Sequence, residues 1–435
     1  MASAELIIRG RRVYLPSGPA PCSIHIAGGR IDSVHPYDQE ADCPVFEAED
    51  LPVLPGLVDT HVHINEPGRT EWEGFRTATR AAAAGGVTTL IDMPLNSVPA
   101  TTSVEGFGAK LAAARGQLWV DTGFWGGVVP GNTAQLAPLL EAGVRGFKCF
   151  LSPSGVEEFR NVSEAELWEA LPELARLGAT LLVHAEWPQA LRPLIGDPRV
   201  YRNYLDSRPG EAELEAIAAL IRGSREFGTR IHIVHLSSAD AVPMIREARA
   251  EGLPITVETC PHYLALAAED IPDGATRFKC APPIRGRENA GRLLAALHEG
   301  VIDLVATDHS PCPPGMKSGD FAAAWGGIAS LQHSLSILWN LAPAACIPRW
   351  MSEAPARLAG LHGRKGAIAA GCDADIVIWN PQGLPAALEH RHKLTPYRIE
   401  NFPGAVEATF LRGRKIYEGG VFESNPYGAI LENTR

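Results

Sequence analysis

The sequence has no closely paired cysteines, no long apolar run and no excess of basic residues. Its eight cysteines are scattered without a C-x-x-C pair, which indicates buried free thiols in a reducing compartment. No run approaches the roughly 18 apolar residues that cross a bilayer. Asp and Glu outnumber Lys and Arg by 50 to 39, for a net charge of −11. This balance argues against nucleic acid or an anionic membrane as a partner.

The N-terminus also lacks the pattern of a secretory signal. The segment MASAELIIRGRRVYLPSG has no long apolar stretch followed by a small-residue cleavage site, so we expect a cytoplasmic protein. With 435 residues, the chain suits a barrel-sized domain of about 250 residues or more plus a smaller unit. Its 46% hydrophobic and 20% charged residues are typical of a globular protein whose core needs no disulfide or structural metal.

In the middle of the chain, apolar β-rich runs alternate with amphipathic segments rich in Ala, Leu and Glu. Near-continuous Val, Ile and Leu strands are typical of a sheet that is buried on both faces. Eight strand–helix units in succession predict a closed parallel (β/α)8 barrel, or TIM barrel, of the α/β class. The eight runs are VLPGLVDTHVH, VTTLIDMP, LWVDTGFWGG, VRGFKCF, ATLLVHAE, RIHIVHLS, PITVETCPH and IDLVATDHS.

The two ends of the chain differ from the middle, because they read as short strands with turns. Residues 5 to about 50 alternate β-branched and polar residues, and the Gly28-Gly29 pair indicates a hairpin. A similar pattern returns in DADIVIWN and EATFLRGRKIYEGG. Since barrel termini lie at the surface, the two segments can pair with each other. We therefore predict a small β-sandwich built from residues 1–52 and 365–435, beside a barrel of residues 53–364.

Ionisable side chains stand at the carboxyl ends of the predicted barrel strands, where barrels of this type carry their active sites. Singly, each has an ordinary explanation. H-x-H arises by chance, a lone histidine is often a satisfied core residue, Lys148 can form an ion pair, and Asp308 can cap a helix. Together they would be costly to desolvate unless something binds them, which favours a metal site. The six residues are His61, His63, Lys148, His184, His235 and Asp308.

Four imidazoles and a carboxylate suit zinc, with cobalt, manganese, nickel or iron as alternatives. An ammonium cannot ligate a cation, but burial and nearby positive charge lower the pKa of a lysine. A neutral Lys148 amine can take up carbon dioxide as a carbamate, whose two oxygens can bridge two metals. A hydroxide shared by two metals is a strong nucleophile at neutral pH. Asp308 is then the candidate catalytic acid and base, which passes the proton to the leaving nitrogen.

The set H-V-H, K, H, H, D resembles the cyclic-amidohydrolase branch of the amidohydrolase superfamily, which includes dihydroorotases, hydantoinases or dihydropyrimidinases, and allantoinases. The resemblance covers essentially the whole chain, from PGLVDTHVH through GVTTLIDMP, GFKCF, IVHLSSADAV, ETCPHYL, KCAPPIR and ATDHSP to GCDADIVIWNP. It implies a carboxylated Lys148 that bridges two metals. It also implies one metal held by His61, His63 and Asp308 and the other by His184 and His235.

Two positions separate the members of this branch. Dihydroorotases use an arginine two residues after H-x-H to grip a carboxylate, and the uncharged Asn65 here cannot replace that grip. Hydantoinases typically have a tyrosine five residues after the lysine, where this sequence has Pro153. The strings HVHINEPGRTEWEGF, DMPLNS, ETCPHYL, KCAPPIRGREN, DHSPCPP and AWGGIASLQ most resemble allantoinases. The resemblance thus implies hydrolysis of the cyclic amide of (S)-allantoin, a ureido-hydantoin, to allantoate in purine breakdown.

An uncharged substrate rich in amide groups needs hydrogen-bond partners rather than a charge clamp. Asn96 in DMPLNS is a candidate, with a turn role before a proline as the alternative. Backbone groups near Cys280 and Ala281 are candidates in KCAPPIR, unless its prolines only shape the loop. Gly326, with its neighbour Gly327, either allows close backbone approach or permits a turn.

Four further residues have two interpretations each. Trp72 and Trp325 either wall the pocket or pack in the core, and His262 and His309 either orient metal ligands or are buried structural histidines. Two alternatives to an allantoinase also stay open. One is a non-catalytic scaffold, as in relatives that have lost metal ligands, although all six positions are filled here. The other is a hydantoinase or dihydropyrimidinase that acts on another uncharged cyclic amide or imide. The resemblance further suggests a homotetramer.

Overall fold

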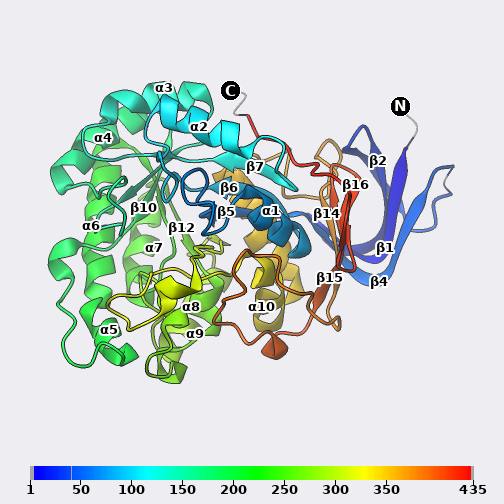
Figure 1. Cartoon of the computed structure of the whole chain (residues 1–435). Helices are drawn as coiled ribbons and strands as arrows, with labels where there is room; N and C mark the ends of the chain where they lie inside the picture. The colour runs from blue at the N-terminus through cyan, green and yellow to red at the C-terminus, as the bar shows by residue number, and fades with distance from the viewer. Residues whose placement is uncertain (1–3, 41, 433–435) are drawn as a thin grey trace.

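A parallel barrel and a folded β-sheet lie side by side in the computed structural model, which describes residues 4–40 and 42–432 (Figure 1). Residues 1–3, 41 and 433–435, which fall within the predicted sandwich segments, lie outside the described residues. None of the helices in the described part of the chain has the length and apolar character needed to cross a membrane. All eight cysteines are free and six are buried, as the sequence predicts.

The predicted (β/α)8 barrel is confirmed, and each of the eight apolar runs supplies barrel strands. Neighbouring strands pair in parallel in two sheets, β5-β6-β7 and β8 to β13. Along the chain, the single residue Trp125 stands between the end of β7 and the start of β8. A parallel bridge between Val62 and His309 closes the ring. The strands are β5 (Leu57–Val62), β6 (Val87–Asp92), β7 (Asp121–Phe124), β8 (Gly126–Gly127), β9 (Phe147–Phe150), β10 (Thr180–His184), β11 (Arg230–Ile233), β12 (Ile255–Thr259) and β13 (Leu304–Val305).

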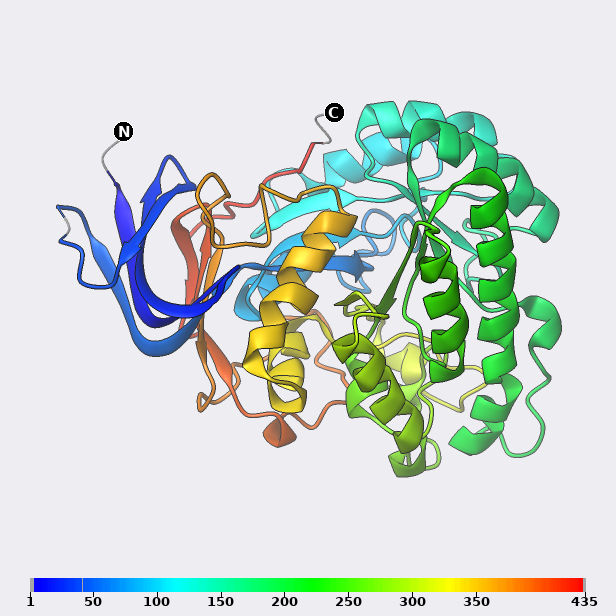
Figure 2. The same ribbon diagram turned by 180° about the vertical axis from the view of Figure 1, so that it is seen from behind.

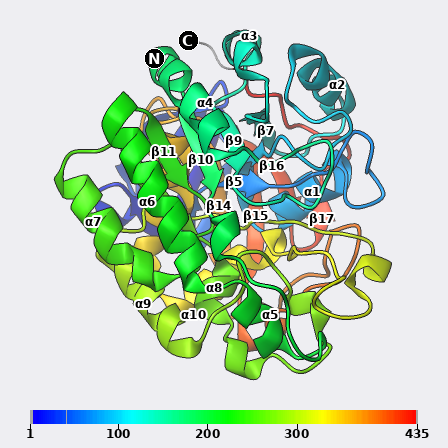
Figure 3. The ribbon, with the colours of Figure 1, turned by 90° about the vertical axis from the view of Figure 1, so that its left-hand side faces the viewer.

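Helices cover the outside of the barrel, and α4 and α6 lie in front of strands β9 to β11 in Figure 3. In α4, Leu167, Leu171 and Leu174 are buried at the spacing of one helix face. The helix begins at a capping box between Ser163 and Glu166 and ends at Gly178 in a left-handed conformation. The helices are α1 (Phe75–Ala84), α2 (Val104–Ala114), α3 (Leu136–Ala142), α4 (Glu164–Leu177), α5 (Tyr201–Ser207), α6 (Gly210–Phe227), α7 (Val242–Ala250), α8 (Pro261–Ala265), α9 (Arg287–His298), α10 (Ser334–Leu341) and α11 (Ala354–Leu358).

Both ends of the chain form one eight-stranded sheet, in which β14 pairs antiparallel with β4. The predicted hairpin at Gly28-Gly29 joins two of its strands. The sheet folds over an apolar core that includes Ile24, Ile376 and Phe410, which agrees with the predicted sandwich. The strand order is β17 (Val421–Phe422), β16 (Arg414–Glu418), β15 (Ala405–Leu411), β14 (Ile376–Asn380), β4 (Val45–Pro55), β1 (Leu6–Leu15), β2 (Gly18–Ala27) and β3 (Arg30–Pro36).

The predicted boundaries between barrel and sandwich, at residues 52 and 365, stay a prediction. Strand β4 continues to Pro55 before β5 begins at Leu57. After β17 the chain returns to the barrel, where Ile430 forms a parallel bridge with Thr122 of β7. Figure 2 shows the folded sheet on one side of the barrel, with the helical segments that follow β13 between them.

A buried charge network joins the barrel to the C-terminal segment. Nζ of Lys365 lies 2.7 Å from a carboxylate oxygen of Asp121 in β7 and 2.7 Å from one of Asp375. Arg412 also bonds Asp121. Burial alone would raise the pKa of Asp121, but the charges of Lys365 and Arg412 outweigh it and hold that pKa below its usual value. The network therefore fixes the folded sheet against β7.

Candidate metal centre

Two histidines and an aspartate converge at the carboxyl end of the barrel strands. His61 lies in β5, His63 directly follows it, and Asp308 lies three residues beyond β13. Nε2 of His61 and Nε2 of His63 lie 3.2 and 3.3 Å from Oδ1 of Asp308. Possible ligand atoms of these residues all lie within 4.8 Å of one another, and the three side chains are buried. Two imidazoles and a carboxylate at this spacing suit a divalent cation.

The charges in this group favour the metal-binding forms. Burial alone would raise the pKa of Asp308, but His61 and His63 hold it well below its usual range. Burial lowers the pKa of His63 to about 4. Asp308 is therefore a carboxylate and His63 a neutral imidazole at neutral pH, and both are the forms that bind metals.

Lys148 of β9 is fully buried beside this group, and its Nζ has no hydrogen-bond partner. The Nζ atom lies 4.9 Å from the centre of the Phe150 ring. Burial lowers the pKa of Lys148 to about 8, although Glu258 and Asp308 act in the opposite direction. An unpartnered ammonium is costly in such surroundings. A carbamate on Lys148 would replace the buried positive charge by two oxygens that can bind cations, and would so remove the cost of burying an ammonium.

His184 and His235 face each other from neighbouring strands. His184 is the last residue of β10, and His235 lies two residues beyond β11. Nδ1 of His184 lies 3.0 Å from Nε2 of His235, and the centre of the His235 ring lies 5.4 Å from that of His61. Burial lowers the pKa of both imidazoles. The structure thus brings all six predicted residues into one buried cluster, while their roles as ligands stay a prediction.

Two buried carboxylates that the motifs did not reveal each hold one of these histidines. Nδ1 of His61 donates to Glu258, which also lies 3.0 Å from Nε2 of His232. Nε2 of His184 donates to Glu186 at 2.7 Å. Each bond fixes the ring proton on one nitrogen and leaves the other nitrogen facing the cluster. Glu258 stands at the start of the ETCPHYL motif, and its position within a barrel strand is the sequence signal for its role.

Arg208 completes the environment of Glu186. Its Nε donates to Oε1 of Glu186 at 3.0 Å, and its Nη2 donates to the other carboxylate oxygen. Burial would raise the pKa of Glu186, but Arg208 and His184 lower it to about 2. The carboxylate therefore stays ionised beside His184.

The backbone at the cluster adopts conformations that non-glycine residues rarely take. Six such residues have positive φ in the described chain, and four of them lie at this end of the barrel. Left-handed backbone costs about 1–2 kcal/mol for such residues and tends to occur at functional sites. The four are Asn65 (φ 66°), Asn96 (67°), His235 (40°) and Asp308 (45°).

A cavity of about 60 Å³ lies against the cluster. Three of the four predicted substrate residues line it: Asn96, Ala281 and Gly326. Cys280 is not among the lining residues, and its carbonyl oxygen accepts a hydrogen bond from Tyr204 at 2.7 Å. The full lining is His61, His63, Leu95, Asn96, Phe150, Pro153, Ser154, His184, Arg208, His235, Ala281, Asp308, Ser310, Trp325 and Gly326.

Comparison with known proteins agrees with this arrangement. The sequence model of the amidohydrolase family matches residues 53–416, which is most of the chain. The chain belongs to the amidohydrolase family. Amidohydrolases are metal-dependent, and the His61, His63 and Asp308 group is a possible metal site of this member.

The relatives of this amidohydrolase include enzymes named allantoinase. It is 49% identical to the allantoinase of Streptomyces avermitilis over 444 aligned residues, which cover 99% of each chain. It is 47% identical to the allantoinase of Saccharomyces cerevisiae, with 88% of this chain and 86% of the yeast chain covered. Among solved structures, L-hydantoinase from Arthrobacter aurescens has a TM-score of 0.89 and 29% identity, with 99% of this chain and 100% of that chain covered.

Other predicted residues of this amidohydrolase lie near the cluster without lining the cavity. Nδ2 of Asn65 donates to the carbonyl oxygen of Pro311 at 3.4 Å. Trp72 packs edge to face on the lining Trp325, with ring centres 4.8 Å apart.

His262 is buried and neither ring nitrogen has a hydrogen-bond partner, while Nδ1 of His309 accepts from the backbone N–H of Ser330 at 3.2 Å. A Cβ at Gly327 would lie 2.5 Å from the carbonyl oxygen of Ser310, so only glycine fits there.

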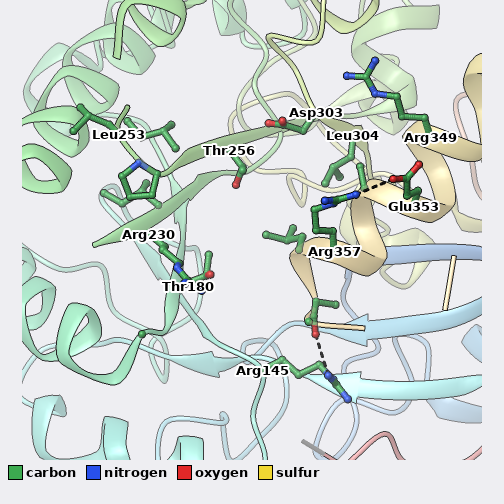
Figure 4. Close-up of a pocket in the computed structure, with 18 residues that line it drawn as sticks. Arg145, Thr180, Arg230, Leu253, Thr256, Asp303, Leu304, Arg349, Glu353 and Arg357 are labelled. Atoms are coloured by element: carbon green, nitrogen blue, oxygen red, sulfur yellow. Dashed lines mark hydrogen bonds and ion pairs between the residues drawn. The ribbon is translucent and has the colours of Figure 1, made fainter. Parts of the chain in front are cut away.

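A much larger cavity, of about 750 Å³, lies at the opposite end of the barrel strands (Figure 4). Its buried arginine, Arg145, donates to the carbonyl oxygens of Ala359 and Leu431. Glu353 and Asp303 in its lining pair with arginines of the protein. Among the described residues, no group of possible metal-binding side chains lies in this cavity, so size alone does not locate the reactive site of this amidohydrolase.

Proposed function

We propose that this amidohydrolase is an allantoinase, which hydrolyses the cyclic amide of (S)-allantoin to allantoate. The observation that carries the proposal is the buried cluster at the carboxyl end of the barrel, with an unpartnered Lys148 among four histidines and Asp308. The name allantoinase is shared by several relatives that are 41–49% identical to the chain and aligned over nearly all of it. Purine breakdown is the pathway in which we place the reaction.

The proposed cofactor is a pair of divalent cations, most simply zinc, with cobalt, manganese, nickel or iron as alternatives. His61, His63 and Asp308 would hold one cation, because their ligand atoms already converge. His184 and His235 would hold the other, because the two rings present facing nitrogens. When bound, the cations would activate a water molecule and polarise the amide carbonyl.

Lys148 would join the two cations as a carbamate. Its lowered pKa leaves a useful fraction of neutral amine near pH 7. The amine nitrogen attacks the carbon of CO2, forms an N–C bond and loses a proton, which gives an anion with two oxygens. The burial of Nζ without a hydrogen-bond partner supports this modification, because within the described residues the ammonium contacts only the Phe150 ring and has no acceptor for its protons.

Asp308 is the proposed catalytic residue. Its carboxylate, kept ionised by His61 and His63, accepts a proton from the attacking water. It then donates that proton to the ring nitrogen as the C–N bond breaks, and the water oxygen stays on the carbonyl carbon as part of the new carboxylate. Asp308 would thus act first as the general base and then as the general acid.

The proposed substrate contacts come from Asn96 and from the backbone near Cys280, Ala281 and Gly326. The cavity lining contains the side chain of Asn96 and no acidic residue besides Asp308, which suits a neutral ring rich in amides. Arg208 also lines the cavity, but Glu186 occupies its Nε and Nη2. A charge clamp for a substrate carboxylate is therefore not a feature of this lining.

The second candidate is a hydantoinase or dihydropyrimidinase, because the solved structure named above, from Arthrobacter aurescens, is an L-hydantoinase. Turnover of allantoin, hydantoin and dihydrouracil by metal-loaded protein, measured side by side, separates the candidates. We expect kcat/KM to be highest for allantoin. No turnover of allantoin would defeat the proposal, and no turnover of any substrate would revive the scaffold alternative.

We also propose that the protein is a cytoplasmic homotetramer. Eight free cysteines are consistent with a reducing compartment, and the resemblance to cyclic amidohydrolases supports the tetramer. Light scattering of the purified protein checks the assembly. A mass about four times the 46.6 kDa of one chain is expected, and a monomer mass would contradict it.

A further inference from the structure

Two lysines outside the metal cluster are bonded to backbone carbonyl groups. Nζ of Lys279 donates to the carbonyl oxygens of Ala322 and Ala324 at 3.0 and 2.5 Å. Nζ of Lys317 donates to the carbonyl oxygens of Lys279 and Trp325 at 2.9 and 2.7 Å. Within the described residues, neither ammonium is found in an ion pair with a carboxylate. In this part of the chain, the ammonium group of each lysine thus bonds only to backbone carbonyl oxygens.

These bonds tie two loops to each other. Lys279 belongs to the loop that precedes α9, and Lys317 belongs to the loop that precedes α10. Lys279 reaches the second loop, and Lys317 reaches back to the first. The hydroxyl of Thr276 adds a bond to the carbonyl oxygen of Lys317. We call residues 312–327 the lid segment.

The surroundings of the two ammonium groups are unfavourable for charge. Burial lowers the pKa of each lysine to about 8. Charge-assisted hydrogen bonds to carbonyl oxygens offset part of this cost and have stricter geometry than apolar contacts. The two buried ammonium groups therefore favour the loop conformation in which these hydrogen bonds form over conformations in which they are broken.

The lid segment carries one wall of the cavity at the metal cluster. Trp325 and Gly326 line the cavity, and Nε1 of Trp325 donates to the hydroxyl of Ser310 at 3.3 Å. Earlier in the segment, Phe321 packs against the rings of Tyr201 and Tyr204, with centres 5.1 and 6.1 Å away. The wall therefore depends on the packing of Phe321 in the middle of the segment as well as on Trp325 itself.

The cavity is too small for a substituted ring. Its volume is about 60 Å³, while cavities that bind small molecules measure about 300–1,000 Å³. The lining also contains His61 and His184 on barrel strands, which cannot retreat without breaking the barrel. The lid segment contains no β-strand and supplies Trp325 and Gly326 to the lining, so it is a part of the lining that can move without breaking the barrel.

We propose that the lid segment opens to admit the substrate and that Lys279 and Lys317 are positioning residues that latch it closed. Without substrate, the latched lid segment leaves only the small cavity; with substrate bound, the same lysines would hold Trp325 and Gly326 against the ring of an uncharged cyclic amide and exclude water from the metal side. The substrate class rests on the proposed function above, whereas the latch is a property of the protein that is measurable without substrate.

Hydrogen–deuterium exchange of the metal-loaded protein, read by mass spectrometry, tests the latch. The variants are Lys279→Met and Lys317→Met, which keep side-chain length and remove the charge. Controls are Lys279→Arg and Lys317→Arg, which keep a cationic donor, and Lys415→Met, because Lys415 pairs with Glu418 on the exposed face of β16. We expect amide exchange in residues 312–327 to rise roughly tenfold or more in the Met variants. Exchange in β5 and β10 should stay unchanged, and the Arg variants should lie close to the original protein.

Steady-state kinetics give a second readout. KM for allantoin should rise about tenfold in the Met variants while kcat changes less than threefold, because the metal cluster is untouched. Unchanged exchange in the lid segment in both Met variants would overturn the latch, as would an equal rise across the barrel strands. If Lys279→Met does not fold, Lys317→Met decides the matter, since Lys317 is only half-buried. Faster lid exchange supports the latch even in a protein that does not turn over allantoin, in which case only the proposed substrate fails.

Discussion

Nδ1 of His184 lies 3.0 Å from Nε2 of His235, so two neutral imidazoles carried by neighbouring strands point their ring nitrogens at each other. One proton shared between the two nitrogens satisfies this contact, and a cation between slightly separated rings would instead be bound by both lone pairs. The pair would thus supply the two imidazole ligands of the second proposed cation.

Replacing either histidine should remove one cation and leave the other. We expect His184→Ala and His235→Ala to bind about one divalent ion per chain instead of two, since His61, His63 and Asp308 stay in place. Mass spectrometry of metals in the dialysed protein measures the ratio. His362→Ala, an exposed position, is the control. Two tightly bound ions in both site variants would contradict the assignment.

Lys148→Ala should lose both activity and metal. The change removes the proposed bridge between the cations, so metal content should fall and kcat should fall by at least about a hundredfold. Added acetate or propionate should restore part of the activity by supplying two oxygens to the space that Nζ leaves. Lys415→Ala should behave like the original protein. Full activity of Lys148→Ala without added acid would defeat the bridging carbamate.

Glu186→Gln should weaken metal binding without unfolding the protein. The carboxylate accepts the Nε2 proton of His184 and is held by Arg208, and loss of such a partner typically costs about 10–100-fold in metal affinity. Competition with a chelator of known affinity measures the change. Glu173→Gln, on the exposed side of α4, should show none. Equal affinities in the two variants would show that Glu186 does not orient His184.

Acid should destabilise the contact between barrel and folded sheet through Asp121. Its folded pKa lies below the unfolded value of about 3.9, so its contribution is fully present above that value and is lost as the pH falls through the folded pKa. Asp121→Asn should be less stable at pH 7, by about 3–5 kcal/mol, and should lose less stability than the original protein between pH 6 and pH 3. Urea unfolding at several pH values measures both.

The pH dependence of stability must be compared between the original protein and Asp121→Asn, because the titration of Asp375 changes stability in the opposite direction to that of Asp121. Burial raises the pKa of Asp375, so its own titration adds stability as the pH falls. Asp240→Asn, which removes an exposed partner of Arg292, controls for the loss of a carboxylate. Parallel pH slopes for the original protein and Asp121→Asn would contradict the role of Asp121.

The barrel and the sandwich were predictable because their signals are local. Continuous apolar runs such as the one before His184 identify buried parallel strands, and the short Gly28-Gly29 hairpin identifies the flanking sheet. The positions of His61 and His235 at strand ends then follow from the topology of a barrel. The break between β7 and β8 at Trp125 has no such local signal.

The carboxylates that bond the predicted metal ligands were not predictable, because these contacts depend on distances across the fold. Glu258 lies 197 residues from His61 in sequence, and only the closed barrel brings the two together. The same holds for the contact of Lys279 with the lid segment 43 and 45 residues away. A lysine in KCAPPIR reads as a surface residue, and only the structure gives it buried carbonyl partners.

The central claim is that a two-cation cluster hydrolyses a ureido-substituted cyclic amide. One preparation, analysed for divalent metal and assayed with allantoin before and after removal of metal by a chelator, tests it most directly. We predict about two ions per chain, release of allantoate by the loaded protein, loss of turnover after chelation and recovery when zinc, cobalt or manganese is restored. Loaded protein that leaves allantoin intact, or turnover that is unaffected by complete removal of metal, would contradict the account.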